Sequence, residues 1–231
     1  MSAARLERLL ICDCDGVLID SEAVAADVLV RELEARWPGV DARPVVMPLL
    51  GLRTERVLDG ACARTGRTLA DTDVDAIRRA VEAAAVEAPA VDGIAAALER
   101  IELSAACASN SDRRYVERAL RRTGLERFFG QRLFCADSVE RPKPAPDVYL
   151  AAAHTLGVAP AQCLVVEDSV TGITAAAAAG MTVLGFIGGA HASPAQIDAL
   201  RSTGAQRVFD DMRQLPGLVA HWVATGAVQP Q

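Results

Sequence analysis

The segment LLICDCDGVLIDSE, residues 9–22, places two aspartates directly after a short apolar run. Residues 9–12 predict a buried strand, and residues two apart in extended backbone point to the same side. Asp13 and Asp15 can therefore face one pocket, while Gly16 permits a tight exit or the close approach of a ligand to the backbone. Neighbouring carboxylates repel each other unless a cation or a raised pKa compensates them. By itself, the pattern also fits an exposed turn.

Further apolar, β-prone runs recur along the chain and alternate with helical patterns. Several runs are nearly continuous in apolar residues, which is typical of parallel strands covered on both faces. The alternation predicts a doubly wound, Rossmann-like α/β core with right-handed crossovers. The predicted strands are Leu9–Cys12, Ala105–Ala108, Leu133–Cys135, Cys163–Val166, Thr182–Phe186 and Val208–Phe209. The predicted helices are Asp92–Ile101, Arg113–Arg122, Pro146–Leu156, Thr171–Ala179 and Pro194–Arg201.

One segment interrupts this alternation directly after the first strand. It contains no convincing strand but three helical stretches, Glu22–Arg36, Thr54–Thr65 and Asp73–Glu87. We therefore expect residues 1–19 and 90–231 to form the catalytic core and residues 20–89 to form an inserted, all-helical cap. Because the insert leaves the core beside the acid pair, a lid over the site is the favoured interpretation, and a purely stabilising ornament is the alternative.

Composition excludes several classes of partner. The 231 residues are 51% hydrophobic and carry a formal net charge of −6, so the basic surface that nucleic acids require is absent from the bulk composition. Charged residues begin at Arg5, before a signal peptide could develop. The uncharged stretch 169–197 is interrupted by glycines, which favours a helix plus a strand over a membrane span. We expect that the protein binds neither nucleic acid nor a membrane, and a monomer is the default expectation.

The six cysteines are scattered and mostly lie in apolar runs. Their spacing matches no zinc site. Free, buried thiols are typical of a cytoplasmic protein, and that is the location we expect.

Three more polar clusters follow predicted strands or precede predicted helices. Glu167 and Asp168 come after the run 163–166, at the strand end where doubly wound folds build their sites. Residues 109–111, Ser-Asn-Ser, supply small donors suited to a phosphate oxygen, and Lys143 stands between two prolines that restrict its backbone. Taken singly, a helix cap explains Asp168 and a surface turn explains Lys143 equally well, and an ordinary polar turn is the better explanation of Ser-Asn-Ser.

Charge links the clusters to one another. Asp13, Asp15, Glu167 and Asp168 would together carry four negative charges, and such a group requires cations, a raised pKa, or both. Lys143 supplies one positive charge, and Mg²⁺ is a hard cation served by carboxylates, carbonyls, water and phosphate. The sequence therefore predicts a magnesium site that acts on a phosphate group.

With these motifs in order, the sequence closely resembles the haloacid dehalogenase-like hydrolases, in particular the phosphatase and β-phosphoglucomutase-like branch with a helical cap. The motifs are DCDGVLIDSE (13–22), ASNS (108–111), RPKPAPDVY (141–149) and VVEDSVTGITAAAAAGM (165–181). The resemblance covers nearly the whole chain. It implies a phosphoric monoester hydrolase that forms an aspartyl-phosphate.

The resemblance implies a catalytic role for three residues. Asp13 is expected to be the nucleophile. Asp15 is expected to protonate the leaving oxygen and then to activate water. Lys143 is expected to stabilise charge on the nucleophile and on the phosphoryl oxygens.

The resemblance also implies the binding groups. Ser109, the backbone around Asn110, Gly16, Lys143 and Asp13 are expected to contact the phosphoryl group. Magnesium is expected to be held by Asp13, by the backbone carbonyl of Asp15 and by Asp168, with Glu167 as a direct ligand or behind the ligands.

Departures from the family pattern narrow the reaction. Dehalogenating relatives lack an acid at the position of Asp15, and phosphonate-cleaving relatives use a cap lysine, whereas residues 20–91 contain no lysine. Mutase-like relatives carry a histidine where this chain has Ala25. We therefore expect a phosphatase, with a phosphosugar mutase as the alternative. A non-catalytic binding module is disfavoured because both Asp13 and Asp15 are present.

The resemblance favours a small phosphorylated metabolite as substrate, a sugar phosphate or a sugar-acid phosphate. Arg43, Arg53 and Arg56 of the insert could meet a second anionic group of such a substrate. Solvated arginines on a helical lid are the ordinary alternative.

Overall fold

The computed structural model describes residues 8–49, 54–188 and 194–228. The chain divides into two compact units, Met1–Ile19 with Ala90–Gln231 and, between them, Asp20–Pro89. Residues 50–53 of the insert lie outside the described residues. Each unit has its own apolar core. The roles of the two units as catalytic core and cap stay predictions.

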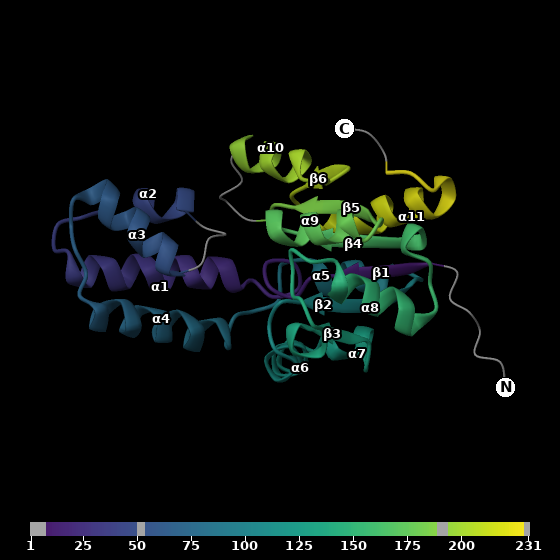
Figure 1. Ribbon diagram of the computed structural model, residues 1–231, viewed down its shortest axis with the longest axis horizontal. Helices are drawn as coiled ribbons and strands as arrows, with labels where there is room; N and C mark the ends of the chain where they lie inside the picture. The colour runs from purple at the N-terminus through teal and green to yellow at the C-terminus, as the bar shows by residue number, and fades with distance from the viewer. Residues whose placement is uncertain (1–7, 50–53, 189–193, 229–231) are drawn as a thin grey trace. The chain divides into compact units, whose positions relative to one another are not determined.

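Six parallel strands form the sheet of the first unit, in the order β3-β2-β1-β4-β5-β6 (Figure 1). The chain builds outward from β1 to β3 and then returns to place β4 on the other side of β1, so the strand order reverses at β1. This confirms the predicted doubly wound α/β class, in which ligands bind at the carboxyl ends of the strands beside such a reversal. The strands are β1 (Leu9–Cys12), β2 (Ser104–Ser109), β3 (Leu133–Cys135), β4 (Cys163–Glu167), β5 (Thr182–Phe186) and β6 (Arg207–Phe209).

Helices cover both faces of this sheet. Consecutive residues of β1 point to opposite faces, and all of them are buried. Leu9 and Ile11 belong to a cluster that includes Val148 and Ile173 from two of the covering helices. Leu10, whose side chain points the other way, is equally inaccessible. The helices of this unit are α5 (Ile94–Glu99), α6 (Arg113–Arg122), α7 (Glu126–Phe129), α8 (Asp147–Leu156), α9 (Val170–Ala178), α10 (Pro194–Ser202) and α11 (Leu215–Thr225).

Two of these helices, α7 and α11, were not expected from the sequence. Pro216 and Gly217 stand near the start of α11 and weaken its helical pattern, yet proline is well tolerated in a first helical turn, where its missing N–H is not needed. Helix α5 begins later than predicted because Gly93, which precedes it, has a left-handed backbone with φ of +80°.

The described residues of the second unit form helices joined by turns and contain no strand, as predicted for the insert. Its helices are α1 (Ser21–Arg36), α2 (Arg43–Val46), α3 (Thr54–Thr65) and α4 (Asp71–Ala85). Leu33, Leu58 and Ile77, one from each of the three long helices, are fully buried in its core. The Arg36 side chain also links α1 to α4, with its Nε 3.0 Å from an Asp73 carboxylate oxygen. The short α2 was not predicted.

None of the described helices combines the length and the apolar composition that a bilayer crossing requires. The uncharged stretch 169–197 contains α9 and β5, the expected helix and strand. All six cysteines are free thiols.

Candidate active site

Three neighbouring strand ends define the candidate site. β1 lies between β2 and β4 in parallel register, so Asp13, the residue after β1, comes level with the ends of both neighbours. Ser109 ends β2 and Glu167 ends β4. All three side chains are buried polar groups, with Asp13 only 7% exposed. The parallel sheet therefore gathers residues that are far apart in the sequence.

The turn that follows β1 brings Asp168 against the backbone. Gly16 has φ of +79°, a left-handed conformation, and its N–H donates to the Ile19 carbonyl at 2.8 Å. A Cβ at Gly16 would lie 1.8 Å from Asp168 Oδ2. Glycine is therefore required here for two reasons, the backbone conformation and the space that the Asp168 carboxylate occupies. Its predicted contact with phosphate stays a prediction.

Lys143, the only lysine in the sequence, joins two of the predicted acids. Its Nζ donates to Asp13 Oδ1 at 2.5 Å, to Glu167 Oε1 at 2.6 Å and to the Ala108 carbonyl at 2.9 Å. An ammonium group has three N–H donors, and all three are used. The predicted convergence of Lys143 on Asp13 and Glu167 is thus seen in the structure, in a position that is 6% exposed.

The Asn110 side chain fixes the backbone that carries Lys143. Its Nδ2 donates to the Lys143 carbonyl at 3.0 Å, and its Oδ1 accepts from the Lys143 N–H at 2.8 Å. The side chain is therefore committed to Lys143, and any phosphate contact at this position falls to the Asn110 backbone. The neighbouring Ser109 Oγ accepts from the Ser111 N–H at 3.0 Å, which leaves its own hydroxyl proton for another acceptor.

Glu167 accepts hydrogen bonds on both carboxylate oxygens. Oε1 accepts from Lys143 and from the Tyr149 hydroxyl, the latter at 2.9 Å. Oε2 accepts from the Asp168 N–H, the Ser169 N–H and Ser169 Oγ, each at 3.0 Å. Gly172, in the first turn of α9, makes room for this carboxylate, because a Cβ there would lie 1.6 Å from Oε1. These five hydrogen bonds exceed the roughly four lone-pair sites of a carboxylate, so its acceptor capacity is fully used.

Burial and mutual proximity shift the pKa values of these groups. Burial raises the pKa of Asp13 to about 8, although Lys143 opposes the shift. Burial acts to lower the pKa of Lys143, but Asp13 and Glu167 outweigh it and hold this pKa well above its ordinary value. For Glu167, burial acts to raise the pKa, but Lys143 and the hydrogen bonds keep it below its ordinary value. One lysine therefore compensates the carboxylates incompletely.

The residues present fit a divalent cation. Asp13, Glu167 and Asp168 each offer a carboxylate oxygen, and these oxygens lie within 4.8 Å of one another. Hard cations such as Mg²⁺ prefer oxygen ligands of this kind. A second positive charge would also favour the ionised form of Asp13, which burial disfavours.

The second aspartate of the motif is held by hydroxyl groups. Asp15 Oδ2 accepts from Ser111 Oγ at 2.8 Å, and Asp15 Oδ1 accepts from the Tyr115 hydroxyl at 2.7 Å. Burial and the adjacent Asp15 carboxylate raise the pKa of Tyr115 above its ordinary value, so the phenol remains a donor. The sequence-based prediction did not name Tyr115 and gave Tyr149 no role. It placed Ser111 among the possible donors to phosphate, whereas in the structure its hydroxyl donates to Asp15. The available signal was rarity, because the chain has only two tyrosines and both contact acids of the site.

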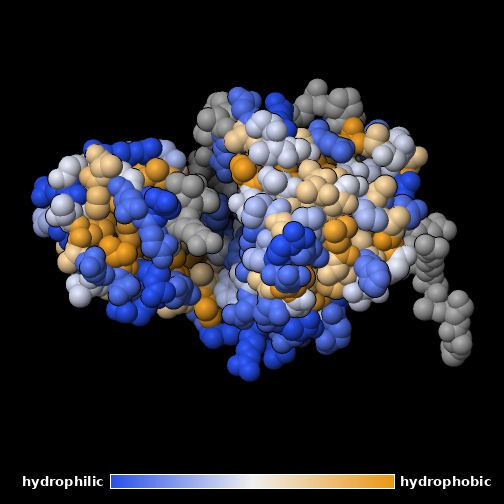
Figure 2. All heavy atoms as spheres, viewed as in Figure 1, coloured by the Kyte–Doolittle hydropathy of each residue, from blue (hydrophilic) through white to orange (hydrophobic). Residues whose placement is uncertain are grey.

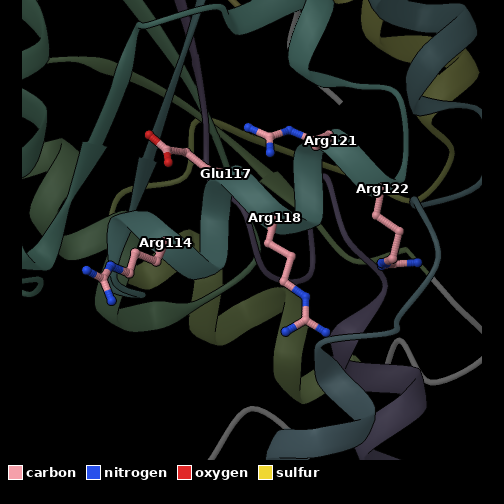
Figure 3. Close-up of a pocket in the computed structure, with 5 residues that line it drawn as sticks. All are labelled: Arg114, Glu117, Arg118, Arg121 and Arg122. Atoms are coloured by element: carbon pink, nitrogen blue, oxygen red, sulfur yellow. The ribbon is translucent and has the colours of Figure 1, made fainter.

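A separate pocket lies on the surface of α6 and shares no residue with the acid cluster. It is lined by Arg114, Glu117, Arg118, Arg121 and Arg122. Arg118 and Arg122 extend from one side of the helix, and Glu117 and Arg121 from another (Figure 3). The surface over α6 is correspondingly hydrophilic (Figure 2). Arg121 and Glu126 form an ion pair here at 3.3 Å, and both side chains are largely exposed. We therefore interpret this surface as a solvated helix face.

Arg43 and Arg56, two of the insert arginines that could meet a second anionic group of the substrate, are exposed. Arg43 pairs with Asp27 at 2.7 Å, and Arg56 lies 3.9 Å from an Asp59 oxygen. Both partners belong to the insert itself. Arg53 lies outside the described residues.

Comparison with known proteins places this arrangement in a family. The sequence profile of the haloacid dehalogenase-like hydrolases matches residues 7–180. The chain is 28% identical over 216 residues to the 6-phosphogluconate phosphatase of Escherichia coli, covering 93% of this chain and 94% of that protein. It is 32% identical over 187 residues to hexitol phosphatase B of the same organism, covering 78% and 84%.

A solved structure shows the same likeness in three dimensions. A haloacid dehalogenase family hydrolase from Deinococcus radiodurans, crystallised with bound phosphate and sodium, superposes with a TM-score of 0.79 at 31% identity. The superposition covers 99% of this chain and 100% of that one. Both the sequence profile and the shared fold lead to the same conclusion: this chain belongs to the haloacid dehalogenase-like hydrolase family.

Proposed function

We propose that this protein is a magnesium-dependent phosphatase that hydrolyses a small phosphorylated sugar or sugar acid through an aspartyl-phosphate intermediate. The observation that carries the proposal is the contact of Lys143 with both Asp13 and Glu167, beside Asp168. The similarity to enzymes named for 6-phosphogluconate and for hexitol phosphates supports the substrate class.

In the first step, an Asp13 carboxylate oxygen attacks phosphorus. The bond between phosphorus and the leaving oxygen breaks, and that oxygen takes the proton of the Asp15 carboxyl group. Lys143, fixed by three hydrogen bonds, stabilises negative charge around Asp13 and on the phosphoryl oxygens. Ser109 and the Asn110 backbone N–H are the proposed donors to the phosphoryl group.

In the second step, Asp15 acts as a base. It removes a proton from water as the water oxygen attacks phosphorus, and the bond between phosphorus and Asp13 breaks. Inorganic phosphate leaves, Asp13 is regenerated as a carboxylate, and Asp15 is again protonated. The two steps together consume one water molecule.

Asp13, Asp168 and the Asp15 backbone carbonyl are the proposed ligands of Mg²⁺. Glu167 instead holds Lys143 and the start of α9, because both of its oxygens are already hydrogen-bonded. When bound, Mg²⁺ would orient the phosphoryl group and offset negative charge that accumulates there.

The proposal is tested by phosphate release from a panel of phosphorylated sugars and sugar acids, with and without Mg²⁺. We expect Asp13→Asn to reduce kcat by about 10⁴-fold or more, the scale on which loss of a covalent nucleophile acts. Transient ³²P labelling of the parent enzyme, absent in Asp13→Asn, would report the intermediate. Equal rates for parent and variant, or an isomerised sugar phosphate without phosphate release, would refute the phosphatase assignment.

A further inference from the structure

Two hydroxyl groups bind the two carboxylate oxygens of Asp15, one each. Ser111 Oγ donates to Oδ2 at 2.8 Å and the Tyr115 hydroxyl donates to Oδ1 at 2.7 Å. Such a pair opposes rotation of the carboxyl plane, because turning it would break both hydrogen bonds.

The first turn of α6 fixes where the Tyr115 phenol lies. Asp112, the residue before the helix, accepts a hydrogen bond from the Tyr115 N–H at 2.9 Å and so caps this turn. The next residues of the inward face, Val116, Ala119 and Leu120, are fully or almost fully buried. The phenol therefore extends from a rigid support, and its contact with Asp15 follows from the position of that support.

We propose that Ser111 and Tyr115 are positioning residues that hold the Asp15 carboxyl group in the orientation from which it protonates the leaving oxygen. This inference rests on the proposed phosphatase function. Proton transfer to a reacting atom requires close alignment of donor and acceptor, and small misplacements reduce its rate strongly. The two hydroxyls supply that alignment from the segment that follows β2 and from the first turn of α6.

The effect of removing either hydroxyl on the reaction rate depends on the leaving group of the substrate. A sugar phosphate expels an alkoxide, which is a poor leaving group unless it is protonated as the bond breaks. A 4-nitrophenyl phosphate expels a stable phenolate, which needs little help from an acid. Because kcat/KM reports the steps through the first irreversible one, the ratio of kcat/KM for the two substrates isolates leaving-group protonation from later hydrolysis.

The experiment measures kcat/KM for 4-nitrophenyl phosphate and for the best alkyl phosphate of the substrate panel, in the full-length parent and in Tyr115→Phe and Ser111→Ala. We expect the alkyl phosphate to lose about 10- to 100-fold and the aryl phosphate less than about 3-fold. Arg114→Ala, on the exposed side of α6, is the matched control and should change neither. Equal losses on both substrates, or an increase on either, would overturn the proposal.

A double-mutant cycle checks that the hydroxyls act through Asp15. In an Asp15→Asn background, Tyr115→Phe should reduce the alkyl rate by less than about 2-fold, because the group it positions is already lost. A full, additive loss in that background would contradict the inference. Absence of all turnover in the parent would instead contradict the proposed function, so the two failures are distinguishable.

Discussion

At the scale of single residues, the site depends on one buried cation shared between two acids. Lys143 is the only lysine of the chain, and its ammonium group contacts Asp13, Glu167 and the Ala108 carbonyl. A buried charge is tolerated only when it is paired and hydrogen-bonded, and here every N–H of the ammonium is used. The same contacts direct the charge at the predicted nucleophile.

A single lysine allows a direct measurement of its charge state. Because Asp13 and Glu167 hold the pKa of Lys143 well above its usual 10.5, the ammonium form should persist at pH values where an exposed lysine is neutral. Protein labelled with ¹⁵N-lysine should give one Nζ resonance, and its titration reports this pKa. Glu167→Gln removes one negative partner and should lower it. A neutral amine below pH 10.5 in the parent would contradict this picture.

The raised pKa of Asp13 predicts that magnesium affinity depends on pH. In the metal-free protein Asp13 is largely protonated below about pH 8, so Mg²⁺ must displace a proton there. Affinity should rise about tenfold per pH unit as the pH approaches 8 and then level off. Calorimetric titrations in buffers of different ionisation enthalpy measure the released proton. Asp13→Asn should abolish this dependence, and a flat profile in the parent would disprove it.

At the scale of elements, α9 can pack closely on the end of β4 because a glycine of α9 leaves space for the Glu167 side chain. Gly172 lies in the first turn of α9, directly over the Glu167 carboxylate that ends β4. The Glu167 hydrogen bonds to Asp168 and Ser169 also tie the strand end to the start of the helix. Helix packing thus fixes the position of the acid that holds Lys143.

A pair of glycine substitutions tests this fit. Gly172→Ala places a methyl group 1.6 Å from Glu167 Oε1 and should destabilise the protein by about 1–3 kcal/mol, with reduced activity. Gly217→Ala, in α11, meets nothing within 4 Å and should stabilise by about 0.5–1 kcal/mol, since alanine favours helix more than glycine does. Urea denaturation of both variants measures the difference. Similar stabilities for the two variants would rule out the close packing described for Gly172.

At the scale of the whole molecule, the chain consists of two units that each bury an apolar core. The hydrogen bonds that join Lys143 to Asp13, Glu167 and Ala108 all lie within the unit that contains the sheet. In that unit, the chain on either side of the insertion is paired, with Ile19 bridged to Ala90 and the Val91 N–H bonded to the Leu18 carbonyl. The two ends of the insertion are therefore adjacent in the sheet-containing unit.

Replacing residues 20–89 by a short Gly-Ser linker tests the predicted role of the insert. The remaining unit should stay folded, with the far-UV circular dichroism of an α/β protein, and should hydrolyse an aryl phosphate slowly. Its kcat/KM for a sugar phosphate should fall at least about tenfold further, because binding of the sugar would be lost together with exclusion of water. An unchanged preference for the sugar phosphate would show that the insert does not select the substrate.

The sequence by itself determined the α/β class, the all-helical insert and the acids that end two central strands. Apolar runs of strand length predict buried parallel strands, and such strands must end at a common edge. That is why the sequence predicts that Asp13, Ser109 and Glu167 lie together. Lys143 joins them in the prediction because the clustered acids require a cation.

Only the tertiary structure decided which donor meets which acid. Asn110 proved to hold the Lys143 backbone, Glu167 proved to be hydrogen-bonded on both oxygens, and Tyr115, 100 positions along the chain, proved to contact Asp15. These contacts depend on the rotational phase of α6 and α8 and on side-chain directions. Packing against the rest of the core sets both, and the local pattern of residue types does not contain that information.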